Sequence, residues 1–319
     1  MLDFSCFDSL VSLVSFFETE DVCKSFLADA RWGEDVVCPY CGAHGCHRCS
    51  DGRFLCSNRE CHKKFVVKVG TVFESSKLPL KTWFMGIYLV SSHKRGISSY
   101  QLARDLGVTQ KTAWFMEHKI RSCFGQDDSV ALVGHVEGDE AYIGGDEKWK
   151  HESKKVSGGQ GGANKTPIFG LISREDGRVV AVKVPNTKGS TILPLINQFV
   201  GGSDTVVYTD ESVIYNALNK KCGFKHLTCN HANKEFSDGN GITTNSIEGF
   251  WSHFKRMIKG TYFHFSEDYT QRYIDEECFR WNTKDETEGK RFELFFKSCI
   301  GRCSFSDVVS LSSIAKKVA

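Results

Sequence analysis

The sequence feature that most constrains the fold is a set of four cysteines near the N-terminus, spaced C-x2-C-x14-C-x4-C. They are Cys38, Cys41, Cys56 and Cys61. Two short thiolate pairs separated by a spacer of hairpin length can close a tetrahedral site around one zinc ion. A segment with so few apolar residues needs such a cross-link in order to fold. The spacing therefore predicts a zinc ribbon over residues 36–72, with strands at 52–55 and 65–67.

The ligand set has competitors inside the same segment. Cys46 and Cys49 form a second C-x2-C pair, and three imidazoles lie nearby, in His44, His47 and His62. Zinc accepts both thiolate and imidazole ligands. The spacing alone leaves open whether one of these residues replaces a member of the quartet.

The remaining apolar runs argue against secretion and against membrane insertion. The run from Leu2 to Phe17 carries Asp3 and Asp8 and lacks a basic flank, so it predicts an amphipathic helix and not a signal peptide. No later run reaches the roughly 20 apolar residues of a spanning helix. Cysteines in metal-ligand spacing favour a reducing compartment, so we expect a cytoplasmic protein without a membrane partner.

Charge is distributed unevenly along the chain. Residues 1–37 hold eight acidic and two basic side chains, whereas residues 81–121 hold seven basic and two acidic ones. An acidic cap followed by a basic stretch is typical of a chain that meets a polyanion over part of its surface.

The basic stretch has the pattern of a helix-turn-helix. A helix is predicted over 81–93 behind Pro79, and then Ser98 and Thr109 stand where N-caps of two further helices belong, with Gly107 as the turn between them. We expect Ala113 and Trp114 to pack the last helix inward. In such a motif the exposed start of the last helix meets base edges, which makes Gln110, Lys111 and Thr112 the candidate DNA-binding residues.

From residue 133 onward the pattern changes to short β-type runs. Strands are predicted at 133–143, 167–173, 179–184 and 205–209, with a turn at Asp176-Gly177 and a helix around 192–199 before the last strand. Strand, strand, strand, helix, strand is the opening of the ribonuclease-H topology. The predicted fold class is α/β: a ribonuclease-H-like mixed sheet with flanking helices, preceded by a zinc ribbon and a helix-turn-helix.

Three acidic residues fall where this fold would expose them. Asp139 lies in the first strand, Asp210 ends the fourth, and Glu248 lies in a predicted helix 38 residues later. Together they predict a site for paired Mg²⁺ or Mn²⁺ ions that acts on a phosphodiester. Lys255 follows Glu248 by seven residues, about two helical turns, and Asn245 precedes it by three, so both share its face.

Other residues compete for these roles or remain without one. Glu137, Glu140 and Glu211 are close enough in sequence to replace an assigned acid. His231 precedes the helix of Glu248 and is expected to be a core or loop histidine. A glycine- and lysine-rich loop is expected over 144–165, and Tyr273, Phe279 and Trp281 predict the inner face of a helix over 269–282.

Over nearly its whole length the sequence resembles the bacterial insertion-sequence transposases related to the Merlin superfamily, with an ISXO2-like transposase domain. The likeness is carried by FFETEDVCKSFLADARWGEDVVCPYCG, GTVFESSKLPLKTWF, GISSYQLARDLGVTQKTAWFMEHKIR, VEGDEAYIGG, VVYTDES and TTNSIEGFWSHFKRMIKGTYFHFSEDYTQRYIDEECFRWN. One departure is the HGCHRC insert inside the ribbon.

The resemblance implies both a domain order and a function. It implies an N-terminal helical segment (1–35), the ribbon (36–72), a helix-turn-helix region (78–125), a ribonuclease-H-like DDE domain (131–300) and a tail (301–319). The four ribbon cysteines match zinc ligands, and Asp139, Asp210 and Glu248 match the catalytic triad, with Lys255 as the lysine after the third acid. Some members use Asn in the third position, so Asn245 stands beside Glu248 as a candidate.

The expected function is a metal-dependent DNA transposase that binds terminal inverted repeats and target DNA, then cleaves and transfers strands. Such enzymes act as multimers, so at least a homodimer is expected on DNA, in the bacterial cytoplasm at the nucleoid. The alternatives are a catalytically silent regulator that binds DNA through the ribbon and the helix-turn-helix, and a nuclease of the same fold without strand transfer.

Overall fold

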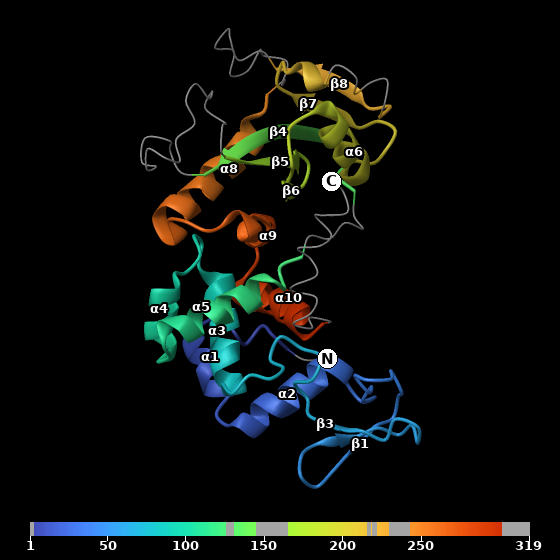
Figure 1. Cartoon of the computed structure of the whole chain (residues 1–319), viewed down its shortest axis with the longest axis vertical. Helices are drawn as coiled ribbons and strands as arrows, with labels where there is room; N and C mark the ends of the chain where they lie inside the picture. Colours follow the sequence, from blue (N-terminus) through green and yellow to red (C-terminus); the bar gives the residue numbers. More distant parts are fainter. Residues whose placement is uncertain are drawn as a thin grey trace, which may run out of the picture. The chain divides into compact units, whose positions relative to one another are not determined.

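The computed structural model describes residues 3–125, 131–144, 165–215, 218, 222–229 and 243–301. The chain forms two compact units, one of residues 1–125 with 285–319 and one of residues 126–284 (Figure 1). His231, the tail after residue 301 and most of the expected loop at 144–165 lie outside the described residues. The domain bounds expected from the sequence stay a prediction. Among the described residues, no helix has the length and apolar character needed to cross a membrane.

The first unit is built from helices and a small sheet. Its helices are α1 (Leu10–Phe16), α2 (Glu20–Trp32), α3 (Leu80–Ser92), α4 (Ser99–Leu106), α5 (Gln110–Arg121) and α10 (Glu288–Ile300). α10 comes from the far end of the chain and packs against α3. The N-terminal apolar run is helical only in its second half, because the Ser9 hydroxyl accepts the amide of Ser12 and starts α1 there.

Phenylalanines form the interior of this unit. Phe7, Phe17 and Phe84 are fully buried, and Phe17 stacks on Phe7 and meets Phe84 edge-on at ring-centroid distances of 5.4 and 4.8 Å. Phe296 of α10 completes the group at 5.0 Å from Phe84. Aromatic rings bury large areas and favour these edge-on geometries, so the cluster joins both ends of the chain in one core.

The predicted pair of helices after residue 97 is present, with the expected caps. The hydroxyls of Ser98 and Thr109 accept amides at the starts of α4 and α5, and Gly107 adopts φ 65° in the turn between them. The expectation for Trp114 was wrong, since its side chain is 41% exposed. Met116 and Ile120 pack the inner face of α5 instead, because they follow Ala113 at helical spacing.

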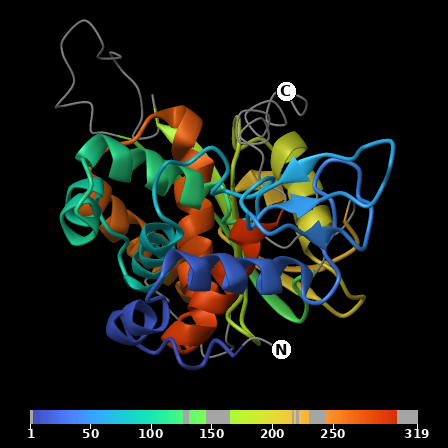
Figure 2. The same cartoon turned by 90° about the horizontal axis from the view of Figure 1, so that it is seen from below.

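The ribbon contributes three short antiparallel strands, β1 (His47–Arg48), β2 (Phe54–Leu55) and β3 (Lys64–Phe65), in the order β1-β2-β3. Figure 2 shows them near the end of α2, where the Trp32 ring meets Phe54 edge-on at 5.1 Å. Phe54 also stacks on Phe65 at 5.7 Å. These three rings supply the apolar packing of an otherwise polar segment.

The second unit is a five-stranded mixed sheet in the order β6-β5-β4-β7-β8. The strands are β4 (His135–Ile143), β5 (Thr166–Ser173), β6 (Val179–Lys183), β7 (Val206–Thr209) and β8 (Lys225–Thr228). β4 pairs antiparallel with β5, and β5 with β6 through a turn at Gly177, which has φ 70°. β7 and β8 run parallel to β4. This is the ribonuclease-H-like arrangement predicted from the sequence.

Helices cover both faces of the sheet. On one face α6 (Gly189–Phe199) and the short η3 (Val213–Tyr215) pack in a core that includes Val136 and Phe169. On the other face α8 (Asn245–Met257) and α9 (Thr270–Asn282) pack in a core that includes Ala141 and Ile168. Of the residues expected to face inward on α9, Tyr273 is buried, whereas Phe279 and Trp281 are half-buried. A π-turn, η5 (Ile258–Tyr262), and a 3-10 turn, η6 (Glu267–Tyr269), connect the two helices.

Candidate active site and metal centres

Three carboxylates converge at one end of the central strands. Asp139 and Glu140 of β4 and Asp210 after β7 each place a carboxylate oxygen within 4.8 Å of the other two. Two of them are the aspartates singled out from the sequence. Glu140 was only a competitor in the sequence analysis, and the structure brings it into the cluster.

The convergence of neighbouring residues follows from the lengths of the strands. Consecutive side chains of a strand point to opposite faces, so Asp139 lies on the α8 face and Glu140 on the α6 face. The pairing of β4 with β7 runs from His135 to Glu137 only, and β7 ends at Thr209. Beyond that point β7 no longer lies alongside β4, so both side chains meet Asp210 where β7 ends.

The carboxylates raise one another's proton affinity. Burial raises the pKa of Asp139 to about 6, and the charges of Asp210 and Glu248 act in the same direction. Burial also raises the pKa of Glu140 to about 7, with contributions from Asp210 and Asp139. Partly buried carboxylates that repel one another are typical of a site that is completed by positive charge.

Tyr215 holds Glu140 in place. Its hydroxyl donates a 2.7 Å hydrogen bond to a carboxylate oxygen of Glu140, and its side chain is fully buried in the core beneath α6. Burial raises the pKa of Tyr215 well above its ordinary value of 10, so the phenol remains a donor. Sequence reasoning missed Tyr215. Its five-residue spacing from Asp210 carries no recognisable signal.

Trp251 of α8 stands beside Asp139 on the other face of the sheet. The register places Asp139 opposite Gly170 of β5, and a Cβ at Gly170 would come within 2.7 Å of the indole ring. Glycine is therefore needed at this position. The indole N–H lowers the pKa of Asp139, although it makes no hydrogen bond of full geometry. Trp251 thus packs α8 onto the sheet and also places a donor near an acid.

The other predicted catalytic residues lie along α8, outside the group of three. Glu248 is exposed, accepts a 3.1 Å hydrogen bond from the Thr244 hydroxyl, and acts on Asp139 through its charge. Asn245 is the exposed first residue of the helix, and Lys255 is exposed two turns beyond Glu248. The position of Glu248 is thus near the cluster, but its carboxylate does not belong to the set joined within 4.8 Å.

Glu137, another competitor, has a different place. It is fully buried, and one carboxylate oxygen accepts the amides of Ser246 and Ile247 at 2.9 and 3.0 Å. Its other oxygen accepts a 2.6 Å bond from Arg174, whose guanidinium lies 4.1 Å from the centre of the Tyr208 ring. A carboxylate at a helix N-terminus satisfies free amides and complements the helix dipole. Glu137 therefore fixes the start of the helix that carries Glu248.

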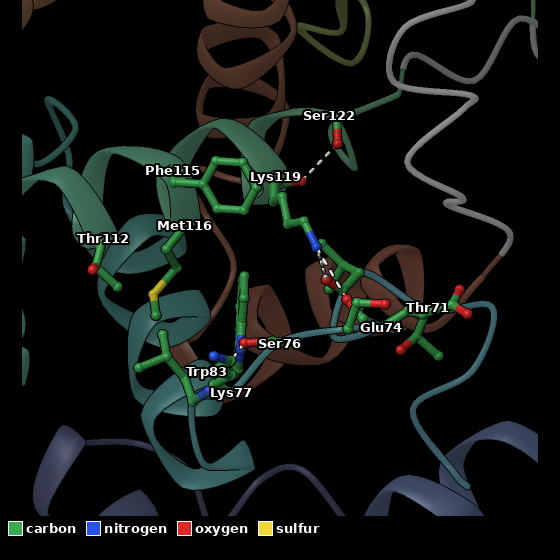
Figure 3. Close-up of a pocket in the computed structure, with 13 residues that line it drawn as sticks. Thr71, Glu74, Ser76, Lys77, Trp83, Thr112, Phe115, Met116, Lys119 and Ser122 are labelled. Atoms are coloured by element: carbon green, nitrogen blue, oxygen red, sulfur yellow. Dashed lines mark hydrogen bonds between the residues drawn. The ribbon is translucent and has the colours of Figure 1, made fainter. Parts of the chain in front are cut away.

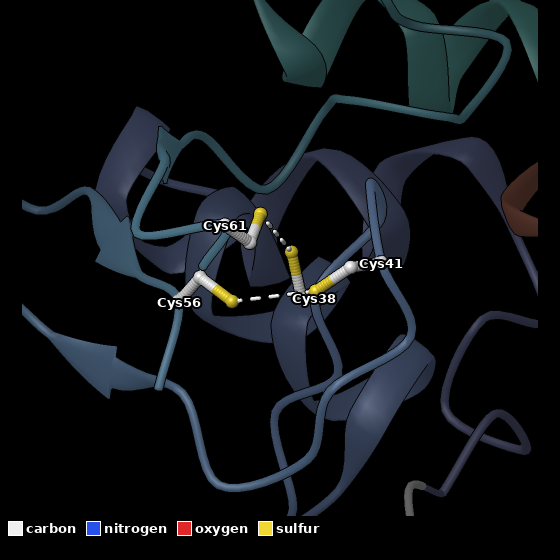
Figure 4. Close-up of side chains that lie close together, drawn as sticks. All are labelled: Cys38, Cys41, Cys56 and Cys61. Carbon is white, nitrogen blue, oxygen red and sulfur yellow. Dashed lines mark hydrogen bonds between the residues drawn. The ribbon is translucent and has the colours of Figure 1, made fainter. Parts of the chain in front are cut away.

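The four cysteines of the predicted quartet also converge (Figure 4). All four sulfurs lie within 4.8 Å of one another, with 3.9 Å between Cys38 and Cys61 and 3.5 Å between Cys41 and Cys56. Sulfurs on a zinc ion with bonds of about 2.3 Å would be about 3.8 Å apart in a regular tetrahedron. The described geometry fits such an ion.

The competing ligands of the ribbon lie outside this group. The His44 ring bonds to Asp35 at 2.6 Å, and the buried Cys46 thiol points to the carbonyl of Ala43 at 3.5 Å. His47 lies exposed in β1, and neither Cys49 nor His62 joins the four sulfurs within 4.8 Å. The HGCHRC insert thus forms part of the fold of the ribbon.

The three candidate DNA-binding residues of α5 differ in exposure. Lys111 is exposed, whereas Gln110 and Thr112 are half-buried. The Gln110 amide donates a 2.8 Å bond to the Ser99 hydroxyl, and the Thr112 hydroxyl lies 2.8 Å from that of Thr109. Among the three, Lys111 is the most available to a partner.

A cavity of about 580 Å³ is lined by residues of the first unit. Figure 3 shows Lys119 between Phe115 of α5 and the segment around Glu74, where its ammonium donates to the carbonyls of Val72 and Glu74 at 3.3 Å each. The indole N–H of Trp83 donates to the Ser76 hydroxyl at 2.8 Å. These polar groups are occupied within the protein, and no carboxylate of the acidic cluster reaches this cavity.

Known protein families match both the part of the chain that holds the acidic cluster and the part that holds the four cysteines. Residues 131–282 match the ISXO2-like transposase domain, and residues 18–64 match the transposase zinc-ribbon domain. A transposase-like protein of Haemophilus influenzae is 30% identical over 141 residues, 44% of this chain and 93% of that protein. A protein in the transposable element ISH50 of Halobacterium salinarum is 28% identical over 260 residues, 77% of this chain and 85% of that protein.

The fold, the acidic cluster and the four-cysteine group define a ribonuclease-H-like protein with an N-terminal zinc ribbon. The chain belongs to the family of insertion-sequence transposases that carry the ISXO2-like domain. Among solved structures, an intasome of simian T-cell lymphotropic virus in complex with a PP2A regulatory subunit aligns over 61% of this chain and 67% of its own, at 11% identity. Its TM-score of 0.31 is too low to add to this assignment.

Proposed function

We propose that this chain is an active DNA transposase that binds the terminal inverted repeats of its insertion sequence, cleaves strands there and joins them to target DNA. The observation that carries the proposal is the convergence of Asp139, Glu140 and Asp210 where the central strand β7 ends. A regulator that only binds DNA would gain nothing from three carboxylates that destabilise one another.

The donor set suits hard divalent cations. Carboxylate oxygens are the ligands preferred by Mg²⁺ and Mn²⁺, and ligand oxygens of one such ion lie within about 4.2 Å of each other. When bound, a pair of these ions activates a water or a 3′-hydroxyl and stabilises the oxygen that leaves phosphorus. Asp139, Glu140 and Asp210 would hold them, and Tyr215 would keep Glu140 oriented through its hydrogen bond.

Residues of α8 complete this proposal. Glu248 is assigned as the third acid of the triad because its charge already acts on Asp139. Asn245, three residues earlier on the same face, is the alternative at that position. Lys255 would bind a DNA phosphate close to the cluster. Glu137 would keep all three in position by capping the helix on which they lie.

The first unit is assigned to DNA recognition. Residues 81–121 carry the excess of basic side chains, and Lys111, with Gln110 and Thr112 beside it, would meet base edges at the start of α5. The ribbon, held by structural Zn²⁺, would add phosphate contacts through its arginines and lysines. Because two ends must be cut together, we expect at least a homodimer on bacterial DNA.

The test uses the full-length protein and labelled DNA from either side of its own gene. We expect strand nicks and joined products in Mg²⁺ or Mn²⁺, and their loss in Asp139→Asn and Asp210→Asn, with DNA binding retained. Glu211→Gln serves as the matched control, because Glu211 is an exposed neighbour of Asp210 outside the acidic cluster.

Each other outcome has a defined meaning. Binding to end DNA without cleavage by the wild-type protein in either metal would favour the silent regulator. Cleavage without joined strands would favour a nuclease. Wild-type cleavage rates in Asp139→Asn would refute the assignment of the site. Comparing Glu248→Gln with Asn245→Ala would identify the third residue of the triad.

A further inference from the structure

The segment that follows α8 ends that helix in a strained way. The helix widens into the π-turn η5, in which the amide of Phe263 bonds to the carbonyl of Ile258 at 2.7 Å. Phe263 itself has φ 56° and ψ −52°, and the amide of His264 reaches back to the carbonyl of Tyr262 at 2.6 Å. This is a γ-turn of the rare, positive-φ form, and π-turns are frequent at functional sites.

The chain is anchored to α9 on both sides of Phe263, at Tyr262 and at Phe265. The Tyr262 hydroxyl donates a 2.6 Å bond to Glu276, a fully buried acid that is paired with Arg280 at 2.6 Å. On the other side, the ring of Phe265 stacks on Tyr273 at a centroid distance of 4.1 Å. Two fixed points so close together determine the turn between them, and a strained backbone persists only under such constraint.

The turn presents its aromatic ring to solvent. The Phe263 side chain is 78% exposed, equal to the most exposed of the large hydrophobic side chains described. At Phe263, the exposed apolar ring and the strained backbone both lower the stability of the folded protein. Local costs of this kind are expected at functional positions, where another property of the residue is being used.

The segment of chain that leads to the ring is basic. From Gly249 to Ser266 the chain carries Lys255, Arg256 and Lys259 and no acidic residue, and all three of these side chains are exposed. The next acid along the chain, Glu267, is paired with Lys183 at 3.0 Å. An exposed aromatic ring among cations is the combination that binds single-stranded nucleic acid, because bases stack on the ring while cations meet the phosphates.

We propose that Phe263 is a stacking platform for one unpaired base of the DNA strand at the active site, with Lys255, Arg256 and Lys259 on the flanking phosphates. The inference rests on the proposed transposase function.

The test compares replacements of Phe263 in the full-length protein. The probes are end-DNA duplexes with 2-aminopurine at successive positions, and the same duplexes with mismatched end positions. Phe263→Ala should weaken binding to mismatched ends about 5- to 150-fold and abolish the fluorescence change at one of the labelled positions. Phe263→Trp should retain both signals, and Phe263→Leu, which is apolar without a π-face, should lose them.

A stability measurement separates this role from a structural one. Glycine accepts positive φ without strain, so Phe263→Gly should raise the unfolding temperature while it weakens binding to mismatched ends. Wild-type behaviour of Phe263→Leu, or loss of self-association without DNA in Phe263→Ala, would overturn the inference in favour of an apolar protein contact. If the wild-type protein neither binds nor cuts end DNA, the proposed function itself has failed. If it does both and Phe263→Ala matches it, only the stacking proposal has failed.

Discussion

Replacing Asp139 by asparagine should make the protein more stable when no divalent cation is present. In the folded state the pKa of Asp139 is raised from its ordinary value of 3.8 to about 6, mainly by burial. The folded state therefore holds this proton more tightly than the unfolded chain does. Stability contributed by such a group is present at low pH and is lost as the pH rises from about 4 to about 6.

The magnitude follows from the same values. At about 1.4 kcal/mol per pH unit, moving the pKa from 3.8 to about 6 destabilises the charged form by about 3 kcal/mol at pH 8. At pH 5 the effect is about half as large, because the folded side chain is then mostly protonated. The asparagine side chain has no charge to bury, so Asp139→Asn should be about 3 kcal/mol more stable than the wild type at pH 8.

The assay is urea unfolding without added Mg²⁺. Unfolding is monitored by amide hydrogen exchange in peptides from β4 and β5. This readout belongs to the second unit, and no chelator is used, so the ribbon keeps its zinc. Saturating Mg²⁺ at pH 8 should stabilise the wild type and leave Asp139→Asn nearly unchanged. Asp204→Asn, an exposed acid in the same unit, is the control. A variant no more stable than the wild type at pH 8, or an equal difference at both pH values, would refute the reasoning.

Two further perturbations test the supports of the two sites. Cys41→Ser should lose one zinc per chain and unfold the ribbon, whereas Cys46→Ser should keep the metal. Mass spectrometry of the zinc content measures the difference, and an equal loss of zinc from both variants would contradict the assigned quartet. Glu137→Gln should lower the free energy of unfolding by about 2–3 kcal/mol, because Arg174 and two helix amides lose a charged partner, and should slow cleavage. Denaturant titration beside Glu211→Gln measures the difference, and a change below about 0.5 kcal/mol would show that the cap is dispensable.

Much of the fold could be predicted because its signals are local. The N-cap hydroxyls of Ser98 and Thr109 and the positive φ of Gly107 follow from residue type and position. The hairpin at Asp176-Gly177 follows from two apolar strand segments joined by a short turn. The cysteine spacing likewise identified four sulfurs that meet. Trp114 was placed incorrectly because it directly follows the buried Ala113, whereas helical spacing from Ala113 puts Met116 and Ile120 on the inner face.

The acidic site was predicted only in part, because its geometry depends on where strands end. Alternation along β4 separates Asp139 from Glu140, and only the early end of β7 allows both to meet Asp210. The hydrogen bond from Tyr215 depends on a turn whose path cannot be seen in composition or periodicity. Glu137 looked like a catalytic candidate until its carboxylate was found on the amides of α8. Burial and pairing, not residue type, distinguish these acids.

The most direct measurement of the central claim is the anomalous scattering of Mn²⁺ in crystals of the full-length protein. We expect a peak coordinated by carboxylate oxygens of Asp139, Glu140 and Asp210 at about 2.2 Å, with Glu248 approaching it when DNA is bound. A well-occupied Mn²⁺ elsewhere, with these three side chains free of metal at millimolar concentration, would contradict the assignment of the metal centre.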